Sequence, residues 1–174
     1  MIALPLVTSR LVIDPLVEAD APAVAGYRSD PVVARYQGWA VPYPVEQAAA
    51  LAGSGQLAMR LGAALVGDAM VAPVDGASHA AELGITLAPG WQGQGLATEA
   101  ATALVDAVFA TGRVRVIAYV DTRNDASLRL FDRVGFRREG HLHLSFMSAD
   151  GLIDEVLFAI TADGWRRPAP DTDP

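Results

Sequence analysis

The sequence contains no cysteine, and all 13 of its basic residues are arginine, so lysine is missing too. Without cysteine there is no disulfide frame, no thiolate nucleophile and no cysteine-ligated zinc site. Without lysine there is neither a Walker-type phosphate-binding loop nor Schiff-base chemistry. The 20 acidic residues outnumber the basic ones and give a net charge of −7. Because an acidic surface repels phosphate backbones, we expect no nucleic-acid partner.

Long hydrophobic runs are also missing. The apolar residues 1–7 have no basic flank and are interrupted by Pro5, which does not fit a secretion signal. The longest uncharged stretch, residues 83–98, contains Pro89 and four glycines. Such a segment cannot span a bilayer. We therefore expect no membrane partner and a cytoplasmic protein.

The hydrophobic content of 52% is enough for one packed domain at this length. We expect that domain over residues 1–166, followed by a disordered tail over residues 167–174 that is rich in proline and aspartate. Periodicity and turn residues predict strands at residues 11–13, 56–61, 65–74, 80–87 and 114–120, at Phe136 with the segment around 142–147, and at 153–160. They predict helices at residues 20–28, 45–51 and 124–134, with another from residue 96 to a stop at Gly112 and a short one beginning at Pro31. Because strands and helices do not alternate regularly, this order predicts an α/β (α+β) fold with a mixed sheet and helices on both faces.

Residues 82–98, ELGITLAPGWQGQGLAT, contain the most informative pattern: a strand, a glycine-rich loop and then a helix. Gly93 and Gly95 allow close backbone approach, and the free N–H groups at the helix start point into the loop. Such a loop binds phosphate without a cationic side chain, although a plain glycine-rich turn has the same composition. A nucleotide-dependent oxidoreductase is a further alternative. However, the third position of the G-x-G-x-x-G pattern is Thr98, and no βαβ unit precedes it.

Residues 92–97, QGQGLA, match the Q/R-x-x-G-x-G/A signature of the GNAT superfamily of acyl-CoA-dependent N-acetyltransferases, which this sequence resembles. Residues 95–100, GLATEA, look like the RimJ/RimL-like (ribosomal-protein-alanine N-acetyltransferase-like) branch, which acetylates ribosomal-protein N-termini and other amines. Three further blocks agree in order and spacing: residues 8–11 (TSRL), 124–127 (NDAS) and 134–140 (VGFRREG). The resemblance implies a mostly antiparallel sheet of six to seven strands whose central parallel strands splay apart.

The resemblance also implies that acetyl-CoA is the co-substrate. The loop amides would bind its pyrophosphate, and the strand at residues 85–87 would pair with the extended pantetheine arm through main-chain hydrogen bonds. The cofactor-binding residues that it implies are Ile85, Thr86, Leu87, Gln92, Gly93, Gln94, Gly95, Leu96, Ala97, Thr98, Asn124, Ser127 and Phe131.

Glu82 is the predicted catalytic base. A lysine-like amine has a pKa of ~10.4 and arrives protonated, so a base must take its proton before it can attack a thioester. Glu82 lies ten positions before Gln92, near the point where several GNAT enzymes carry a catalytic glutamate. A solvent-facing charge at a strand edge is the alternative. Because cysteine and lysine are absent, direct attack in a ternary complex is simpler than a covalent acyl-enzyme.

Ser127 is the second predicted catalytic residue. Many GNAT enzymes protonate the leaving thiolate with a tyrosine four residues before a Gly-Phe pair, and this sequence has Phe131 there. Ser127 lies one helical turn earlier on the same face, and in the RimJ/RimL-like branch this serine is the substitute. The alternative is that Ser127 only caps the helix that begins near Asn124.

The expected acceptor is a primary amine, either of a protein N-terminus or of a small molecule. By resemblance, the proline-rich segment 37–44 lines the acceptor pocket, and the candidate substrate-binding residues are Tyr36, Trp39, Tyr43, His143 and Glu155. His141 and His143 lie two apart on a predicted strand and so share a face. A metal there would need a third ligand, such as Asp154 or Glu155, and we expect no metal.

Other functions remain open at this point. A catalytically silent acyl-CoA-binding module would have the same loop, and some relatives use another acyl donor such as succinyl-CoA. The presence of both Glu82 and Ser127 favours an enzyme. A homodimer is common among similar proteins and stays open as well.

Overall fold

The computed structural model describes residues 2–167. Most of the elements belong to one mixed sheet, in the strand order β1-β2-β3-β4-β5-β6-β8-β7. Its eight strands are β1 (Leu6–Val7), β2 (Val12–Pro15), β3 (Gln56–Leu61), β4 (Ala64–Val74), β5 (Ala77–Leu87), β6 (Arg115–Asp121), β7 (Arg137–Ser148) and β8 (Gly151–Thr161). The helices are α1 (Ala21–Arg28), α2 (Pro31–Ala34), α3 (Val45–Ala49), α4 (Leu96–Ala110) and α5 (Asp125–Val134). Two short 3₁₀ turns, Glu18–Asp20 and Pro89–Trp91, precede α1 and the glycine-rich loop.

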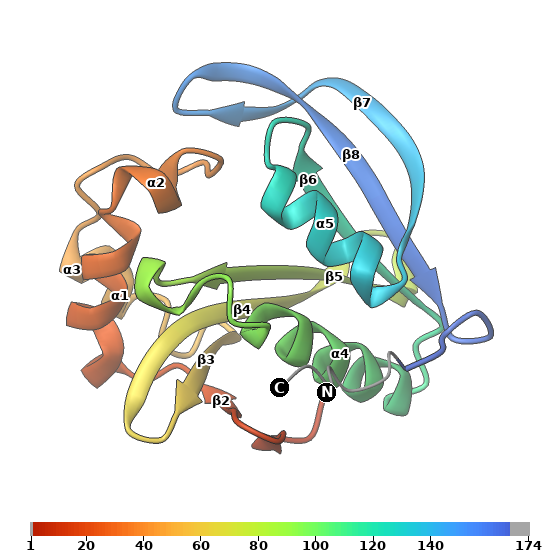
Figure 1. The fold of residues 1–174 in the computed structure, drawn as a ribbon, viewed down its shortest axis with the longest axis horizontal. Helices are drawn as coiled ribbons and strands as arrows, with labels where there is room; N and C mark the ends of the chain where they lie inside the picture. Colours follow the sequence, from red (N-terminus) through yellow and green to blue (C-terminus); the bar gives the residue numbers. More distant parts are fainter. Residues whose placement is uncertain (1, 168–174) are drawn as a thin grey trace.

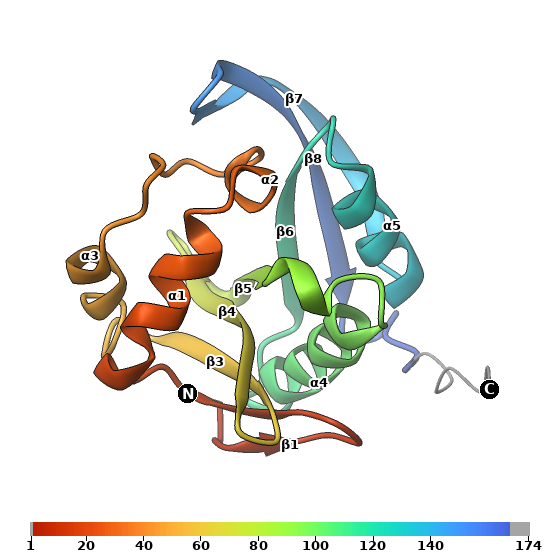
Figure 2. The same ribbon diagram turned by 60° about the vertical axis from the view of Figure 1, so that its left-hand side comes forward.

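Helices cover both faces of the sheet, as the sequence predicts (Figure 2). The side chains of β3 alternate between two hydrophobic cores that lie on opposite faces of the sheet. Leu57 and Met59 pack into the main core with α4 and α5, whereas Ala58, between them, packs into a second core with α1 and α3. Because successive strand residues point to opposite faces, this alternation places α1 and α3 on one face and α4 and α5 on the other.

Helix α4 forms where the apolar spacing predicts it. Its residues Leu96, Ala100, Leu104 and Val108 recur every four positions and are at most 1% exposed. The helix begins directly after Gly95, whose φ of +75° suits glycine, and Gly112, with a φ of +87°, follows its end. The loop therefore leads straight into the buried first turn of the helix.

The central parallel strands separate beyond a short paired segment (Figure 1). β5 and β6 are the only parallel neighbours among the described residues, and they pair only over residues 80–82 and 115–117. Beyond this point β5 stays paired with β4, and β6 stays paired with β8. One edge of β5, residues 83–87, is consequently left without a strand partner on the β6 side. The splayed strands that the resemblance implies are present.

Two features of the sheet differ from the sequence prediction. Residues 2–167 form eight strands instead of six to seven, because the two-residue strand β1 pairs with β2 and is too short to give a periodic pattern. In addition, β7 runs without a break from Arg137 to Ser148, although the pattern predicted a strand only at Phe136 and around residues 142–147. Register shifts at 138/140 and 142/146 interrupt its alternation and hide its length in the sequence.

The long β7–β8 hairpin arches over the sheet toward α2 (Figure 1). Its side chains meet the segment after α2, since a Cβ built on Gly38 would lie 2.7 Å from the Phe146 ring. The predicted tail lies outside the described residues, except for Arg167. Within residues 2–167, no helix has both the length and the apolar content needed to cross a membrane.

Candidate active site

Two adjoining cavities lie where β5 and β6 separate. The first, which we call the loop cavity, has a volume of about 450 Å³ and is bounded by the glycine-rich loop, the start of α4 and the side of α5. The second, which we call the sheet cavity, has a volume of about 610 Å³ and extends between β4, β5, β6 and the β7–β8 hairpin. The residues that line both cavities are Tyr36, Gln37, Ile85, Thr86, Asn124 and Ser127. The unpaired edge of β5 therefore runs along the junction of the two cavities.

The loop cavity has the features of an anion site. Gly93 and Gly95 both have left-handed backbones, with φ of +74° and +75°. In the described part of the chain no side chain caps the start of α4, so its first N–H groups are free to face the cavity. Arg129 and Arg133 of α5 also line the cavity and bring positive charge to it. This combination suits a phosphate-bearing ligand.

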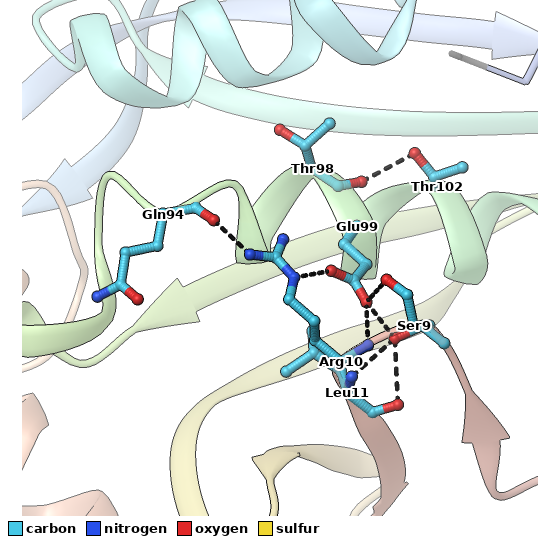
Figure 3. Close-up of polar contacts among 8 residues, drawn as sticks. Ser9, Arg10, Leu11, Gln94, Thr98, Glu99 and Thr102 are labelled. Atoms are coloured by element: carbon cyan, nitrogen blue, oxygen red, sulfur yellow. Dashed lines mark hydrogen bonds and ion pairs between the residues drawn. The ribbon is translucent and has the colours of Figure 1, made fainter. Parts of the chain in front are cut away.

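A hydrogen-bond network joins residues 8–10 to the glycine-rich loop and to the first turn of α4 (Figure 3). Glu99, in the first turn of α4, accepts hydrogen bonds from the Ser9 hydroxyl at 2.9 Å, the Arg10 backbone N–H at 2.8 Å and Arg10 Nε at 2.6 Å. The Thr8 hydroxyl donates to the same carboxylate. Arg10 Nη1 donates to the backbone carbonyl of Gln94 at 2.8 Å. Partial burial opposes the charge of Glu99, but these hydrogen bonds outweigh it and hold the pKa of Glu99 at about 2.

Glu82 lies in the wall of the sheet cavity, in the last residue pair that β5 and β6 share. It is half-buried, and burial raises the pKa of its carboxyl above the ordinary value. The negative charge of Glu155, which lines the same cavity from β8, raises the pKa of Glu82 further. A carboxyl with a raised pKa next to a cavity is suited to accept a proton near neutral pH.

A buried ion pair forms another part of the sheet-cavity wall. Arg28 Nη2 donates to Asp68 Oδ1 at 2.8 Å, and the two side chains are 7% and 2% exposed. Gln56 Nε2 donates to the same oxygen at 2.8 Å, and the Tyr27 hydroxyl donates to Asp68 Oδ2. Arg28 pairs with Asp68 and Arg123 pairs with Asp121, so Glu82 and Glu155 are the carboxylates lining this cavity that have no ion-pair partner among residues 2–167.

The start of α5 places Ser127 at the junction of the two cavities. Asn124 Oδ1 accepts a hydrogen bond from the Ser127 backbone N–H at 3.1 Å, so Asn124 caps the helix. The Ser127 hydroxyl donates no hydrogen bond to any residue in the described part of the chain. It lines both cavities and is free to meet a ligand. Tyr36 and Thr86, which also carry hydroxyl groups, line the same junction.

Most of the residues expected at the cofactor site line the loop cavity, and Gln94 and Phe131 do not. Gln94 turns away, with its side chain donating to the Gly90 carbonyl at 2.9 Å, and Phe131 is a buried residue beside the sheet cavity. The residues that do line the loop cavity are Ile85, Thr86, Leu87, Gln92, Gly93, Gly95, Leu96, Ala97, Thr98, Asn124 and Ser127.

The five expected acceptor contacts divide into two groups. Tyr36, Trp39 and Glu155 line the sheet cavity. Tyr43 does not, because it is 5% exposed and packs against the Arg28 guanidinium. His143 also lies outside both cavities, on the outer face of the β7–β8 hairpin, where it is 3.0 Å from Asp154 Oδ2.

Sequence reasoning missed the two arginines of α5. Arg129 and Arg133 lie four residues apart, so they share one helix face, and that face borders the loop cavity. The spacing was visible within the predicted helix at 124–134. Only the packing of α5 beside the loop showed which neighbour that face has.

Comparison with known proteins points to acetyltransferases. Residues 10–137 match the acetyltransferase (GNAT) domain family. The chain is 36% identical over 94 residues to the ribosomal protein uS5-alanine N-acetyltransferase of Escherichia coli, an alignment that covers 53% of this chain and 48% of that protein. The chain thus spans about half the length of the curated relatives it matches.

Two solved structures have the same fold. The GNAT-family acetyltransferase from Bacillus anthracis superposes with a TM-score of 0.84 at 27% identity, covering 91% of this chain and 98% of that one. Mycobacterium smegmatis RimJ, solved in complex with CoA-disulfide, superposes with a TM-score of 0.80 at 24% identity, covering 88% of this chain and 82% of that one. Since the family match extends from residue 10 to residue 137, this chain belongs to the GNAT acetyltransferase family.

Proposed function

We propose that the protein transfers an acetyl group from acetyl-CoA to a primary amine, either a protein N-terminus or a small molecule. The unpaired edge of β5 is the observation that carries this proposal. It begins next to Glu82, runs along the junction of the two cavities and ends near the glycine-rich loop. An extended chain that bears amides can add to such an edge through main-chain hydrogen bonds. Membership of the GNAT family supports the same activity.

The described residues fit acetyl-CoA. The amides of residues 92–98 would receive its pyrophosphate, and Arg129 and Arg133 would face its negative charge. The edge at residues 83–87 would hold the pantetheine arm. When bound, acetyl-CoA supplies the acetyl group as a thioester.

Glu82 would act as the base, directly or through a water molecule. An amine with a pKa of ~10.4 is protonated at neutral pH and cannot attack until it loses a proton. Burial and the charge of Glu155 raise the pKa of Glu82, which makes its carboxylate a stronger proton acceptor. Attack of the neutral nitrogen on the carbonyl carbon forms the C–N bond and breaks the C–S bond. The Ser127 hydroxyl would then donate to the leaving sulfur.

The sheet cavity would take the acceptor. Its two uncompensated carboxylates, Glu82 and Glu155, favour a cationic amine, and the aromatic side chains of Tyr36 and Trp39 line the same cavity. Another acyl donor such as succinyl-CoA, a catalytically silent acyl-CoA-binding module, a homodimer and a cytoplasmic setting stay as predictions from the sequence.

A thiol-release assay with acetyl-CoA tests this proposal. The acceptors are a peptide with an N-terminal alanine, a polyamine and a set of small primary amines, and mass spectrometry checks each product for the added acetyl group. We expect turnover with at least one acceptor, and we expect Glu82→Gln to lower kcat by about 100-fold or more with little change in the Kd of acetyl-CoA. Binding of acetyl-CoA without turnover of any acceptor would instead support the silent module. An unchanged kcat in Glu82→Gln would remove Glu82 from the mechanism.

A further inference from the structure

Three side chains with metal-binding atoms meet on the outer face of the β7–β8 hairpin. His141 and His143 come from β7, and Asp154 comes from β8. Asp154 Oδ2 lies 2.8 Å from His141 Nε2 and 3.0 Å from His143 Nδ1. One ligand atom of each residue lies within 4.8 Å of the others. These residues take no part in either cavity of the proposed active site.

The backbone of β7 brings the two histidines together. Residues 143–145 form an irregular segment opposite Asp154, between the pairs Leu142–Glu155 and Phe146–Ile153. Leu144 has a φ of +49°, and it is the only residue other than glycine with a positive φ in residues 2–167. The imidazole centroids lie 4.5 Å apart, which is closer than the ~6.6 Å that separates the Cα atoms of alternate residues in a regular strand. Both rings therefore lean toward the same carboxylate.

The carboxylate is held in position by a separate contact. The backbone N–H of Leu144 donates to Asp154 Oδ1 at 2.9 Å, so one oxygen is occupied and Oδ2 faces the imidazoles. Contacts of this kind fix the orientation of a ligating side chain and raise its affinity for metal. The irregular segment 143–145, which we call the bulge, thus supplies His143 and also the Leu144 N–H that orients Asp154.

Two imidazole nitrogens and one carboxylate oxygen form a donor set that binds Zn²⁺ and similar transition-metal ions. With bonds of about 2.0–2.1 Å, neighbouring ligand atoms lie ~2.9 Å apart at right angles and ~3.3 Å apart in a tetrahedron. The two nitrogen–oxygen separations of 2.8 and 3.0 Å are already close to this range. The histidine side chains are 53% and 79% exposed, so water can complete the coordination.

Although the sequence alone led us to expect no metal, we propose that His141, His143 and Asp154 form a binding site for a divalent transition-metal ion, represented by Zn²⁺. The site would link β7 to β8 on the face opposite the sheet cavity. Ile153 and Glu155, the neighbours of Asp154, line that cavity from the inner face, as do Ser145 and Phe146 from the bulged strand. A metal at this site would therefore fix the hairpin segment that forms one wall of the sheet cavity.

The composition of the chain makes the test clear. There is no cysteine to compete for the metal, and the only histidine outside the cluster is His79 on β5. The full chain, freed of metal with a chelator, is titrated with ZnCl₂ by isothermal calorimetry. We expect saturable binding of one Zn²⁺ per chain and no binding of Mg²⁺, which prefers oxygen ligands.

The variants His143→Ala and Asp154→Asn each remove one of the three ligands, so we expect each to weaken Zn²⁺ binding by at least about 10-fold. His79→Ala is the matched control and should bind as the unchanged chain does. Circular dichroism checks that each variant is folded. Because the His143 side chain is exposed, we expect His143→Ala to fold normally. Three results would each overturn the proposal: no Zn²⁺ binding by the unchanged chain, wild-type affinity in a folded His143→Ala variant, or an equal loss in His79→Ala.

Discussion

Arg10 donates through Nη1 to the backbone carbonyl of Gln94 at 2.8 Å, and so joins the N-terminal turn to the centre of the glycine-rich loop. The same guanidinium donates through Nε to Glu99, in the first turn of α4 (Figure 3). One side chain thus contacts both the loop and the helix that follows it. The segment 8–11 therefore supports a loop that lies more than eighty positions away in the sequence.

Arg10→Ala should weaken the binding of acetyl-CoA. The variant frees the Gln94 carbonyl and loosens the loop whose amides would hold the pyrophosphate. Because Arg10 is 46% exposed, we expect only about a fivefold rise in Kd, with kcat nearly unchanged. Calorimetry and steady-state kinetics measure the two effects. Arg138 is 52% exposed and belongs to an ion pair that borders neither cavity, so Arg138→Ala is the control and should leave Kd unchanged. Equal affinity in both variants would show that Arg10 does not support the loop.

Glu99→Gln should destabilise the fold in a pH-dependent way. The pKa of Glu99 is about 2 in the folded chain against an ordinary value of 4.5, so the ionised carboxylate stabilises the fold above pH 4.5. That stabilisation is lost as the pH falls from 4.5 toward 2, where the protonated side chain resembles glutamine. Urea unfolding at pH 7 should show a loss of about 1–2 kcal/mol in the variant. A difference between the two chains that does not shrink in acid would contradict this account.

Glu155→Gln should shift the acid side of the pH–rate profile to lower pH. Activity falls in acid because Glu82 must be deprotonated to act as a base. Glu155 raises the pKa of Glu82 through its charge, so its removal lets Glu82 stay ionised at lower pH. The profile of kcat/KM measures this shift, with Glu46→Gln on α3 as a control that should not move it. A shift of the acid side of the profile to higher pH in Glu155→Gln would contradict this prediction.

Ser127→Ala should lower kcat by roughly 10- to 100-fold without destabilising the chain. Asn124, not Ser127, caps α5, so the helix keeps its cap in this variant. Asn124→Ala should instead lower the free energy of unfolding by about 1 kcal/mol. Tyr36→Phe tests the phenolic hydroxyl at the junction. If Tyr36→Phe slowed turnover and Ser127→Ala did not, the donor to the sulfur would be Tyr36.

The features that could be predicted from the sequence are local ones. The conformation at Gly95 and the four-residue spacing that begins at Leu96 are properties of neighbouring residues, so the loop and α4 were predicted close to their observed bounds. The strand at residues 56–61 was predicted with its bounds because its turns are marked by glycine on both sides. Local chemistry was sufficient in these cases.

The features that were missed depend on how distant segments pack. Tyr43 lies in the expected acceptor segment, but it packs against Arg28, which belongs to α1. His143 alternates with Leu142, which lines the sheet cavity, so His143 points to the outer face, where it meets Asp154 of β8. No pattern within residues 124–134 shows that α5 lies beside the loop. Such placements follow from tertiary packing, which overrides local preference.

A crystal structure of the chain with coenzyme A tests the central claim most directly. The account predicts that the pyrophosphate lies against the backbone amides of residues 92–98, that the pantetheine arm runs along β5 at residues 83–87, and that the sulfur ends near Ser127. A nucleotide bound elsewhere, with the edge of β5 still free, would contradict it.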